Sequence, residues 1–229
     1  MSMKLNEKQQ EAATTLNGCL LIVAVAGSGK TTVLINRAVN LVNAGVDPKR
    51  ILMITFTRYA ARNMATKAKE IGDNKCIGLY TSTFHSFYLD MLRRYGNIIG
   101  MDPNFVILNS DGSIEDSISQ VMAKYTEYGE VKGFPSFSDI REAYSYAINT
   151  GRPLDQVLSE FKETMDYVAE LCDLYEIWTK EKKATNNYTY DDLMVKMLEL
   201  MQTENGRNAV SSLFDYIMLI FCFVIFQMS

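Results

Sequence analysis

The segment from Cys19 to Thr31 constrains the fold of this chain more than any other part of its sequence. It begins with the continuous apolar run CLLIVAV, and the glycine-rich sequence AGSGKT follows directly. An apolar run that ends at a glycine-rich turn is typical of a strand buried on both faces of a sheet. From Lys30 to Ala44, apolar residues recur at helical spacing on one face. We therefore predict a buried strand at 19–25, a tight loop and then a helix.

The alternation of strand and helix continues to about residue 95. Apolar runs at 51–56 and 77–81 predict two more strands, and helical patterns at 60–71 and 84–95 predict the helices that follow them. Strands that alternate with helices at this spacing pair in parallel through right-handed crossovers. This part of the chain therefore predicts the α/β fold class with a parallel sheet.

Beyond residue 95 the pattern becomes mostly helical and acidic. Apolar residues between Leu158 and Tyr175 alternate in spacings of three and four, which fits a helix of a small bundle or a short coiled coil. We divide the chain into 1–95 as the first part of an α/β domain, 96–185 as an inserted helical subdomain, and 186–229 as the return to the α/β domain. The last segment predicts a helix at 191–201 and a strand at 216–224.

The charges are distributed unevenly along the chain. The formal net charge is −4, but residues 1–100 carry 13 lysines and arginines against 6 acidic residues, and the remaining residues carry 10 against 21. A basic front half and an acidic rear half fit one face that meets an anion while the rest stays solvated. A chance segregation of surface charge is the alternative.

Cysteine, histidine and hydropathy patterns exclude several classes of protein. The four cysteines are far apart and the histidine is single, so no zinc-site spacing occurs and reduced thiols are expected. The N-terminus is polar and lacks the apolar stretch of a signal peptide. The longest apolar run, 216–226, is about half of the roughly 20 residues that cross a bilayer. We therefore expect a cytoplasmic chain with no membrane partner.

The loop at 24–31, AVAGSGKT, fits the pattern of a phosphate-binding loop, with alanine at its first position. Small residues let successive backbone N–H groups turn toward phosphate oxygens. In this pattern the lysine reaches the β- and γ-phosphates, and the threonine hydroxyl coordinates magnesium. We predict nucleotide binding here, with Lys30 and Thr31 as the catalytic candidates and Thr31 as the Mg²⁺ ligand; an ordinary glycine-rich turn is the alternative. The nucleotide-binding candidates in the loop are Ala26, Gly27, Ser28, Gly29, Lys30, Thr31 and Thr32.

Four further motifs accompany this loop. LNEKQQEA begins at Leu5, ITFTRYAARNM at Ile54, TFHSF at Thr83 and YDDLM at Tyr190. In this order and spacing the set closely resembles the N-terminal half of the UvrD/Rep/PcrA-like superfamily 1 ATP-dependent DNA helicases. The resemblance runs from Leu5 to about Leu219 and matches the helical middle only loosely.

The resemblance implies ATP, with Mg²⁺, as the ligand. In that family the glutamine of the L-N-x-x-Q motif hydrogen-bonds the adenine edge, which assigns this role to Gln9. An amide presents a donor and an acceptor together, as adenine requires. Asn6 and Gln9 also have the spacing of a helix capping box, which is compatible with that role. The family often has arginine where Thr32 stands, so this position departs from its pattern.

The resemblance also implies contacts with single-stranded DNA. Phe56 offers a surface on which a base stacks, Thr57 can bond a phosphate, and Arg58 stands where the family usually has asparagine. Thr83 and His85 belong to the family's next DNA-contacting motif. Two alternatives remain open, namely Phe56 as part of a buried strand and His85 as a structural hydrogen-bonding residue.

The carboxylate pair that ATP hydrolysis needs is missing from its expected place. In the family an apolar strand ends in Asp-Glu, but here Ile220 and Phe221 stand at those positions. Asp191 and Asp192 lie at a predicted helix start, where N-terminal capping explains at least one of them. We therefore expect a chain truncated at its Walker B strand, by a frameshift or by design, with negligible ATP hydrolysis.

Together these observations predict a RecA-like P-loop NTPase sheet with an inserted all-helical subdomain. The chain would be the N-terminal, ATP- and DNA-binding portion of an ATP-dependent DNA helicase or translocase. Its expected partners are single-stranded or partly duplex DNA and a C-terminal motor domain missing from this chain. We expect a monomer, with association through the apolar C-terminal strand as a hazard. A non-catalytic ATP- and DNA-binding module and a phosphate-loop kinase of a small molecule are the alternative functions.

Overall fold

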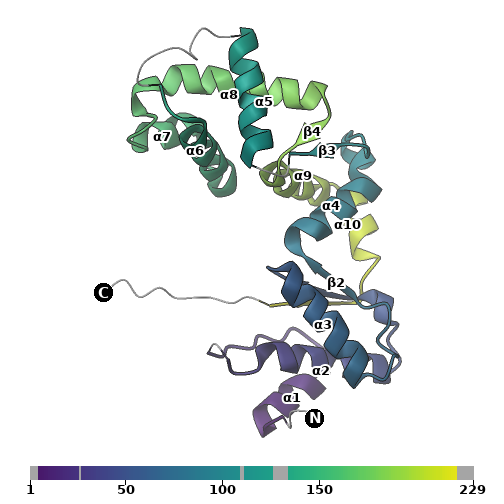
Figure 1. Cartoon of the computed structure of the whole chain (residues 1–229). Helices are drawn as coiled ribbons and strands as arrows, with labels where there is room; N and C mark the ends of the chain where they lie inside the picture. The colour runs from purple at the N-terminus through teal and green to yellow at the C-terminus, as the bar shows by residue number, and fades with distance from the viewer. Residues whose placement is uncertain (1–4, 26, 109–110, 126–133, 221–229) are drawn as a thin grey trace. The chain divides into compact units, whose positions relative to one another are not determined.

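The computed structural model describes residues 5–25, 27–108, 111–125 and 134–220. Within these ranges the chain forms ten α-helices, and its contacts divide it into two units (Figure 1). Unit 1 comprises the described residues up to Phe87 and from Arg207 onward, and unit 2 runs from Tyr88 to Gly206. The chain thus leaves unit 1 and later returns to it.

The chain passes from one unit to the other at two points, and these points differ from the boundaries that the sequence pattern predicts. The helical pattern puts them after 95 and after 185, whereas the contacts divide the chain within α4 (Phe84–Tyr95) and within α10 (Glu204–Ser211). A helix shows no break in its apolar periodicity where it passes from one packing environment to another. Periodicity alone therefore cannot place these boundaries.

Three parallel strands form the sheet of unit 1 within the residues that the structure describes. β1 (Ile51–Thr55) lies in the centre, with β2 (Tyr80–Thr83) on one side and β5 (Tyr216–Leu219) on the other. The register pairs Thr55 with Thr83 and Ile54 with Leu219, so the carboxyl ends of the strands lie at one edge. All of β1 is buried, as expected of a central parallel strand. The predicted parallel sheet is confirmed for this unit.

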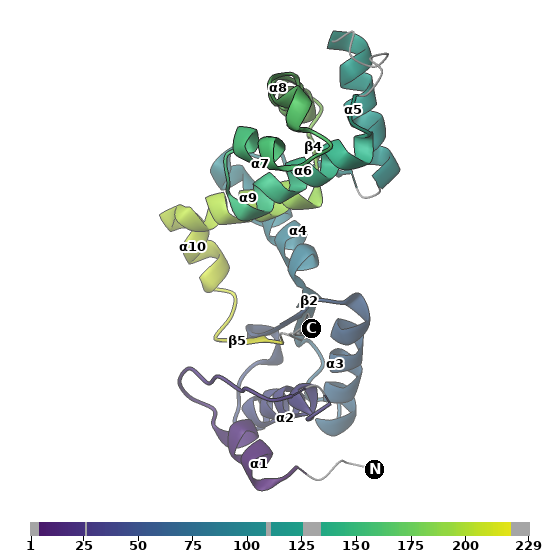
Figure 2. The ribbon, with the colours of Figure 1, turned by 90° about the vertical axis from the view of Figure 1, so that its left-hand side faces the viewer.

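Helices α2 (Lys30–Asn43) and α3 (Arg58–Ile71) lie on one side of this sheet (Figures 1 and 2). Buried side chains from α2, β1, α3 and β5 form the core between them, among them Ile35, Met53, Met64 and Met218. α1 (Glu7–Thr14) packs on α2, and a 3-10 turn at Pro48–Arg50 leads into β1. The helical spacing of apolar residues in α2 and α3 thus serves to cover the sheet.

The strand predicted at 19–25 is wrong. This segment has no regular secondary structure, and Leu21, Val23 and Val25 are exposed to 84%, 86% and 79%. A strand needs hydrogen-bonding backbone partners as well as apolar side chains. In the part of the chain that the structure describes, β1 is paired on both sides, by β2 and β5, and the segment 19–25 pairs with neither of these outer strands. The apolar run therefore indicates a tendency to be buried but supplies no partner.

The strand predicted at 77–81 begins later, at Tyr80. Residues 72–78 form turns, in which Asp73, Asn74 and Gly78 have φ of 48°, 62° and 107°. These residue types tolerate the left-handed region best. Ile77 therefore lies in a turn before β2, and its side chain is 60% exposed.

The remaining predicted elements of unit 1 agree more closely with the structure. The helix predicted at 60–71 begins two residues earlier, at Arg58, and the helix predicted at 84–95 is confirmed. Of the strand predicted at 216–224, β5 covers Tyr216–Leu219, and 221–224 lie outside the described residues.

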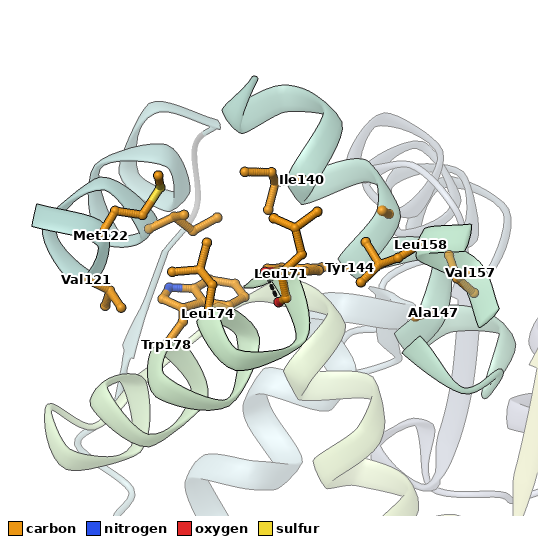
Figure 3. Close-up of a cluster of buried hydrophobic side chains, with 12 residues drawn as sticks. Val121, Met122, Ile140, Tyr144, Ala147, Val157, Leu158, Leu171, Leu174 and Trp178 are labelled. Carbon is orange, nitrogen blue, oxygen red and sulfur yellow. Dashed lines mark hydrogen bonds between the residues drawn. The ribbon is translucent and has the colours of Figure 1, made fainter. Parts of the chain in front are cut away.

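Unit 2 is a bundle of helices around one apolar core (Figure 3). Tyr144, Leu171 and Trp178 are among the side chains buried in this core. Two short parallel strands, β3 (Val106–Ile107) and β4 (Asn187–Tyr188), pair in the same unit. The helices are α5 (Asp111–Tyr125), α6 (Phe137–Thr150), α7 (Leu154–Glu160), α8 (Val168–Ala184) and α9 (Tyr190–Gln202).

The apolar pattern between Leu158 and Tyr175 belongs to two helices. α7 ends at Glu160, a 3-10 turn follows at Met165–Tyr167, and α8 begins at Val168. The buried Thr164 hydroxyl donates to the Leu158 carbonyl at 2.8 Å and holds the turn between them. Both helices contribute to the core of the bundle, so the bundle interpretation is confirmed and the coiled coil is wrong.

Candidate nucleotide and nucleic-acid site

The loop before α2 has the backbone of a tight glycine turn. Gly27 and Gly29 have φ of 78° and 83°, in the left-handed region that favours glycine, and α2 begins at Lys30. The first N–H groups of a helix have no partner within the helix and lie at the positive end of its dipole. The loop therefore offers backbone donors to an anion. Ala26 lies outside the described residues.

Lys30 and Ser28, two polar residues of this loop, differ in their side-chain hydrogen bonding. Lys30 Nζ donates to the carbonyl oxygens of Ala24 and Val25, both at 2.8 Å. Ser28 Oγ is buried and, among the described residues, has no hydrogen-bond partner. An unsatisfied buried hydroxyl costs about 1–3 kcal/mol. An acceptor oxygen placed beside Ser28 would remove that cost.

Gln9 lies against the loop, although 19 residues separate it from Ser28 in sequence. Its Nε2 donates to the Ser28 carbonyl at 2.9 Å, and its Oε1 accepts from the Asn6 backbone N–H at 2.9 Å. Asn6 in turn caps α1 by accepting from the Gln9 backbone N–H, which completes the predicted capping box. The structure thus brings Gln9 together with the loop.

Two residues of α2 that the sequence analysis did not select hold α1 in place. Arg37, only 6% exposed, donates to the carbonyl oxygens of Ala12 at 3.3 Å and Leu16 at 3.4 Å. Asn40 Nδ2 donates to the Ala13 carbonyl at 2.9 Å. Burial lowers the pKa of Arg37. The signal that could have identified Arg37 is its place four residues after Val33 and four before Leu41, on the buried face of the helix.

The two segments predicted to contact DNA meet at the carboxyl edge of the sheet. Thr55 and Thr83 are paired across β1 and β2, so the residues that follow them lie side by side. The ring centroids of Phe56 and Phe84 are 5.4 Å apart. Phe56 is 59% exposed, so the alternative that places it in a buried strand is wrong. The edge therefore presents an aromatic surface.

The polar residues predicted at this edge have different surroundings. Thr57 caps α3, because its Oγ1 accepts from the Ala60 N–H at 3.1 Å, and it remains exposed. Arg58 and His85 are also exposed. Thr83 is 7% exposed, and its hydroxyl donates to Ser86 Oγ at 2.9 Å. Its side chain therefore hydrogen-bonds the first turn of α4.

Tyr59 is an exposed aromatic residue that the sequence analysis missed. It lies in the first turn of α3, three residues after Phe56, and its side chain is 80% exposed. An exposed aromatic residue within a motif that ends a buried strand is the signal that could have identified it. With a side chain that is 80% exposed, Tyr59 contributes little to the packing of unit 1.

The aspartates of the YDDLM motif have structural partners within unit 2. Asp192 Oδ2 accepts from the Thr189 backbone N–H at 2.7 Å and from Lys182 Nζ at 2.7 Å, and Asp192 completes the capping box in which Thr189 is the N-cap of α9. Asp191 Oδ1 accepts from Asn149 Nδ2 at 2.8 Å. Capping therefore accounts for Asp192, and a bond to α6 accounts for Asp191.

The position expected to carry a magnesium-binding carboxylate is apolar. Ile220 follows β5, is 7% exposed, and donates its backbone N–H to the Ile54 carbonyl at 3.0 Å. Phe221 lies outside the described residues. Over the residues with described positions, no group of three or more histidine, cysteine, aspartate and glutamate side chains could hold a metal ion.

None of the helices in the described ranges combines the length and the apolar character needed to span a membrane.

Comparison with known proteins relates the chain to one family. Residues 5–219 match the model of the UvrD/REP helicase N-terminal domain. The ATP-dependent DNA helicase PcrA of Leuconostoc citreum is 33% identical over 204 residues, which cover 87% of this chain and 26% of that protein. PcrA of Staphylococcus aureus is 30% identical over 200 residues, covering 86% and 26%. A probable DNA helicase II homolog of Mycoplasma capricolum is 27% identical over 222 residues, covering 94% and 30%.

Proposed function

Since the chain belongs to the UvrD/REP helicase N-terminal domain family, we propose that it binds ATP at the loop before α2 and single-stranded DNA at the carboxyl edge of its sheet. The chain spans about a quarter of the length of the PcrA relatives it matches, 26% in each case. The proposed function is therefore that of the nucleotide- and DNA-binding portion of a helicase. Unit 1 would be its RecA-like motor domain and unit 2 the inserted helical subdomain.

The buried Ser28 hydroxyl is the observation that carries the nucleotide site. It lacks a partner among the described residues, and it lies next to the helix start, where backbone donors converge. A phosphate oxygen would accept from both kinds of donor at once. Lys30 Nζ is bonded to loop carbonyls 2.8 Å away, and it would exchange these neutral acceptors for charged phosphate oxygens.

Gln9 keeps the hydrogen-bonding capacity that adenine recognition requires. Its amide can donate twice and accept twice. One donor is used by the Ser28 carbonyl and one acceptor site by the Asn6 N–H, so one of each remains. The 6-amino group and N7 of adenine present a donor and an acceptor side by side. The capping box and the proposed base contact are therefore compatible.

Mg²⁺ would be held by Thr31 and the phosphates. Thr31 lies in the first turn of α2, half-buried, beside the loop that would hold the phosphates. A bound Mg²⁺ neutralises phosphate charge. At the end of β5, Ile220 supplies no carboxylate to hold it or to orient water. We infer that the chain binds nucleotide without turning it over.

The proposed DNA site combines exposed rings with exposed cations. Phe56 and Tyr59 are 59% and 80% exposed, and Arg58 and Arg62 are exposed on the same helix start. Basic residues at a helix N-terminus oppose the helix dipole, so their placement there favours contact with an anion over helix stability. In sites that bind single-stranded nucleic acid, bases stack on exposed rings and cationic side chains contact the phosphates.

Replacing Phe56 or Tyr59 with alanine should each weaken binding of a single-stranded oligonucleotide about 10-fold, because stacking on one aromatic ring contributes about 1–3 kcal/mol. Tyr59→Phe is the matched control, since it keeps the ring. Fluorescence anisotropy of a labelled oligonucleotide measures the affinity. Equal affinity of Tyr59→Ala, Tyr59→Phe and the parent chain would remove Tyr59 from the site.

The proposed function is tested by titrating a labelled single-stranded oligonucleotide with and without a non-hydrolysable ATP analogue. We expect the chain to bind both ligands and to release negligible inorganic phosphate when ATP replaces the analogue. A small-molecule kinase would ignore the oligonucleotide. Steady ATP hydrolysis stimulated by the oligonucleotide would contradict the inferred lack of turnover.

A further inference from the structure

α1 is too short to hold its own position. It has 8 residues, and isolated helices of that length are not stable in water. Its first turn carries Gln9, the proposed base-contacting residue, and its last carbonyl groups have no partners within the helix. What fixes the two ends of α1 therefore fixes where the Gln9 amide lies.

The C-terminal end of α1 is bonded to side chains of α2. Arg37 reaches the carbonyl oxygens of Ala12 and Leu16, and Asn40 reaches that of Ala13. Ala13 itself is fully buried. A cation at the C-terminus of a helix is stabilised by the helix dipole, and a guanidinium can serve two carbonyls at once. These contacts fix α1 both along its axis and in rotation about it.

The N-terminal end of α1 lies on the loop that begins the same helix α2. Gln9 Nε2 is 2.9 Å from the Ser28 carbonyl oxygen. A Cβ built on Gly29 would lie 3.1 Å from the same Nε2 atom. Gln9 precedes Ala12 and Ala13 by about one helical turn, roughly 5 Å. One rigid helix, α2, therefore holds α1 at both ends, and the phosphate-binding loop is the N-terminal extension of that helix.

We propose that Arg37 and Asn40 are positioning residues for base recognition, which hold α1 on α2 so that the Gln9 amide lies at the loop. This inference rests on the proposed nucleotide site. Among the described residues, the hydrogen bonds of Arg37 and Asn40 go to Ala12, Ala13 and Leu16 and not to the loop, so we assign neither residue a contact with the phosphates. Their loss changes the recognition of the base and leaves the recognition of the triphosphate intact. A purely structural role would weaken both together.

The test compares two ligands, Mg·ATP and Mg·tripolyphosphate, the second of which has no base. Arg37→Met should weaken the binding of Mg·ATP about 10-fold, which corresponds to the loss of one to two hydrogen bonds. The same variant should change the affinity for Mg·tripolyphosphate less than about 2-fold. Asn36→Ala is the matched control, because the hydrogen bond of the Asn36 side chain to a described residue stays within α2, where Nδ2 donates to the Thr32 carbonyl. It should leave both affinities unchanged. Calorimetric titration gives both constants.

A double-mutant cycle ties the effect to Gln9. Gln9→Ala should weaken the binding of Mg·ATP to a similar extent. The double variant with Arg37→Met should bind Mg·ATP only slightly more weakly than either single variant, because both changes remove the same contact. If Arg37→Met does not fold, Asn40→Ala, which removes a single hydrogen bond, replaces it in the cycle.

If Arg37→Met weakened the binding of both ligands equally, or if the losses of Mg·ATP affinity in the cycle were additive, the positioning role would be overturned. The proposed nucleotide site would not be affected by either result. If the parent chain bound neither ligand, the proposed function would fail, and the inference would fail with it.

Discussion

Lys30→Ala should weaken binding of Mg·ATP roughly 30- to 100-fold, because it removes a hydrogen bond and a charge from the phosphates. Among the described residues, Lys30 Nζ donates to the carbonyls of Ala24 and Val25, and these bonds lie at the surface. Their loss should therefore change the melting temperature little. The variant separates binding from folding.

Lys69→Ala is the control for this prediction. Lys69 is an exposed lysine in the last turn of α3, so the variant removes the same charge from unit 1 away from the loop. It should bind Mg·ATP as the parent chain does. Calorimetric titration of the three proteins is the measurement, and equal affinity of Lys30→Ala and the parent would contradict the assignment of the loop.

Trp178→Ala should destabilise unit 2 by about 3–5 kcal/mol, the usual cost of emptying a large buried aromatic site. Trp178 is 3% exposed and stacks on Tyr144, with ring centroids 5.9 Å apart. Its Nε1 donates to Ser117 Oγ at 2.9 Å, and Lys182 Nζ lies 3.9 Å from its ring centroid. Removing the ring therefore opens a cavity and takes away the donor that bonds Ser117 Oγ.

Trp178→Phe separates these two effects. It keeps most of the ring and loses the Nε1 donor, so it should cost only about 1–2 kcal/mol. Chemical denaturation followed by circular dichroism compares the variants. Because Trp178 is the single tryptophan of the chain, fluorescence of the parent reports on unit 2 alone. A loss of less than about 1 kcal/mol for Trp178→Ala would show that unit 2 is packed differently.

The helices of this fold are largely predictable from the sequence. α2, α3, α4 and α9 lie within two residues of their predicted bounds at each end. Each has an apolar face at helical spacing, and a helix satisfies its backbone internally, so local pattern suffices to place it. The parallel order of β1 and β2 followed from the helix between them.

Strands were harder to predict because their partners are remote in sequence. The run at 19–25 is more apolar than β2, yet β2 pairs with β1 and 19–25 does not pair within the described residues. β5 pairs with β1 although 160 residues lie between Thr55 and Tyr216. Hydropathy measures burial, whereas pairing depends on which strands the connections bring together.

The candidate site was predictable where a motif names its residues. The motif residue Gln9 lies at the loop, and the motif residue Phe56 lies exposed beside Phe84, while the ligand contacts assigned to both stay predictions. Arg37 was missed because a cation on an apolar helix face gives no indication of which carbonyls it will reach. Its partners belong to another helix and follow from the packing of α1 on α2.

Hydrogen–deuterium exchange with and without Mg·ATP tests the central claim most directly, because it locates the ligand on the chain. The backbone N–H groups of the loop and of the first turn of α2 are the donors assigned to the phosphates. We predict slower exchange at residues 27–33 and at Gln9, with little change in the bundle of unit 2. Protection confined to the bundle, or none at the loop under saturating Mg·ATP, would contradict the account.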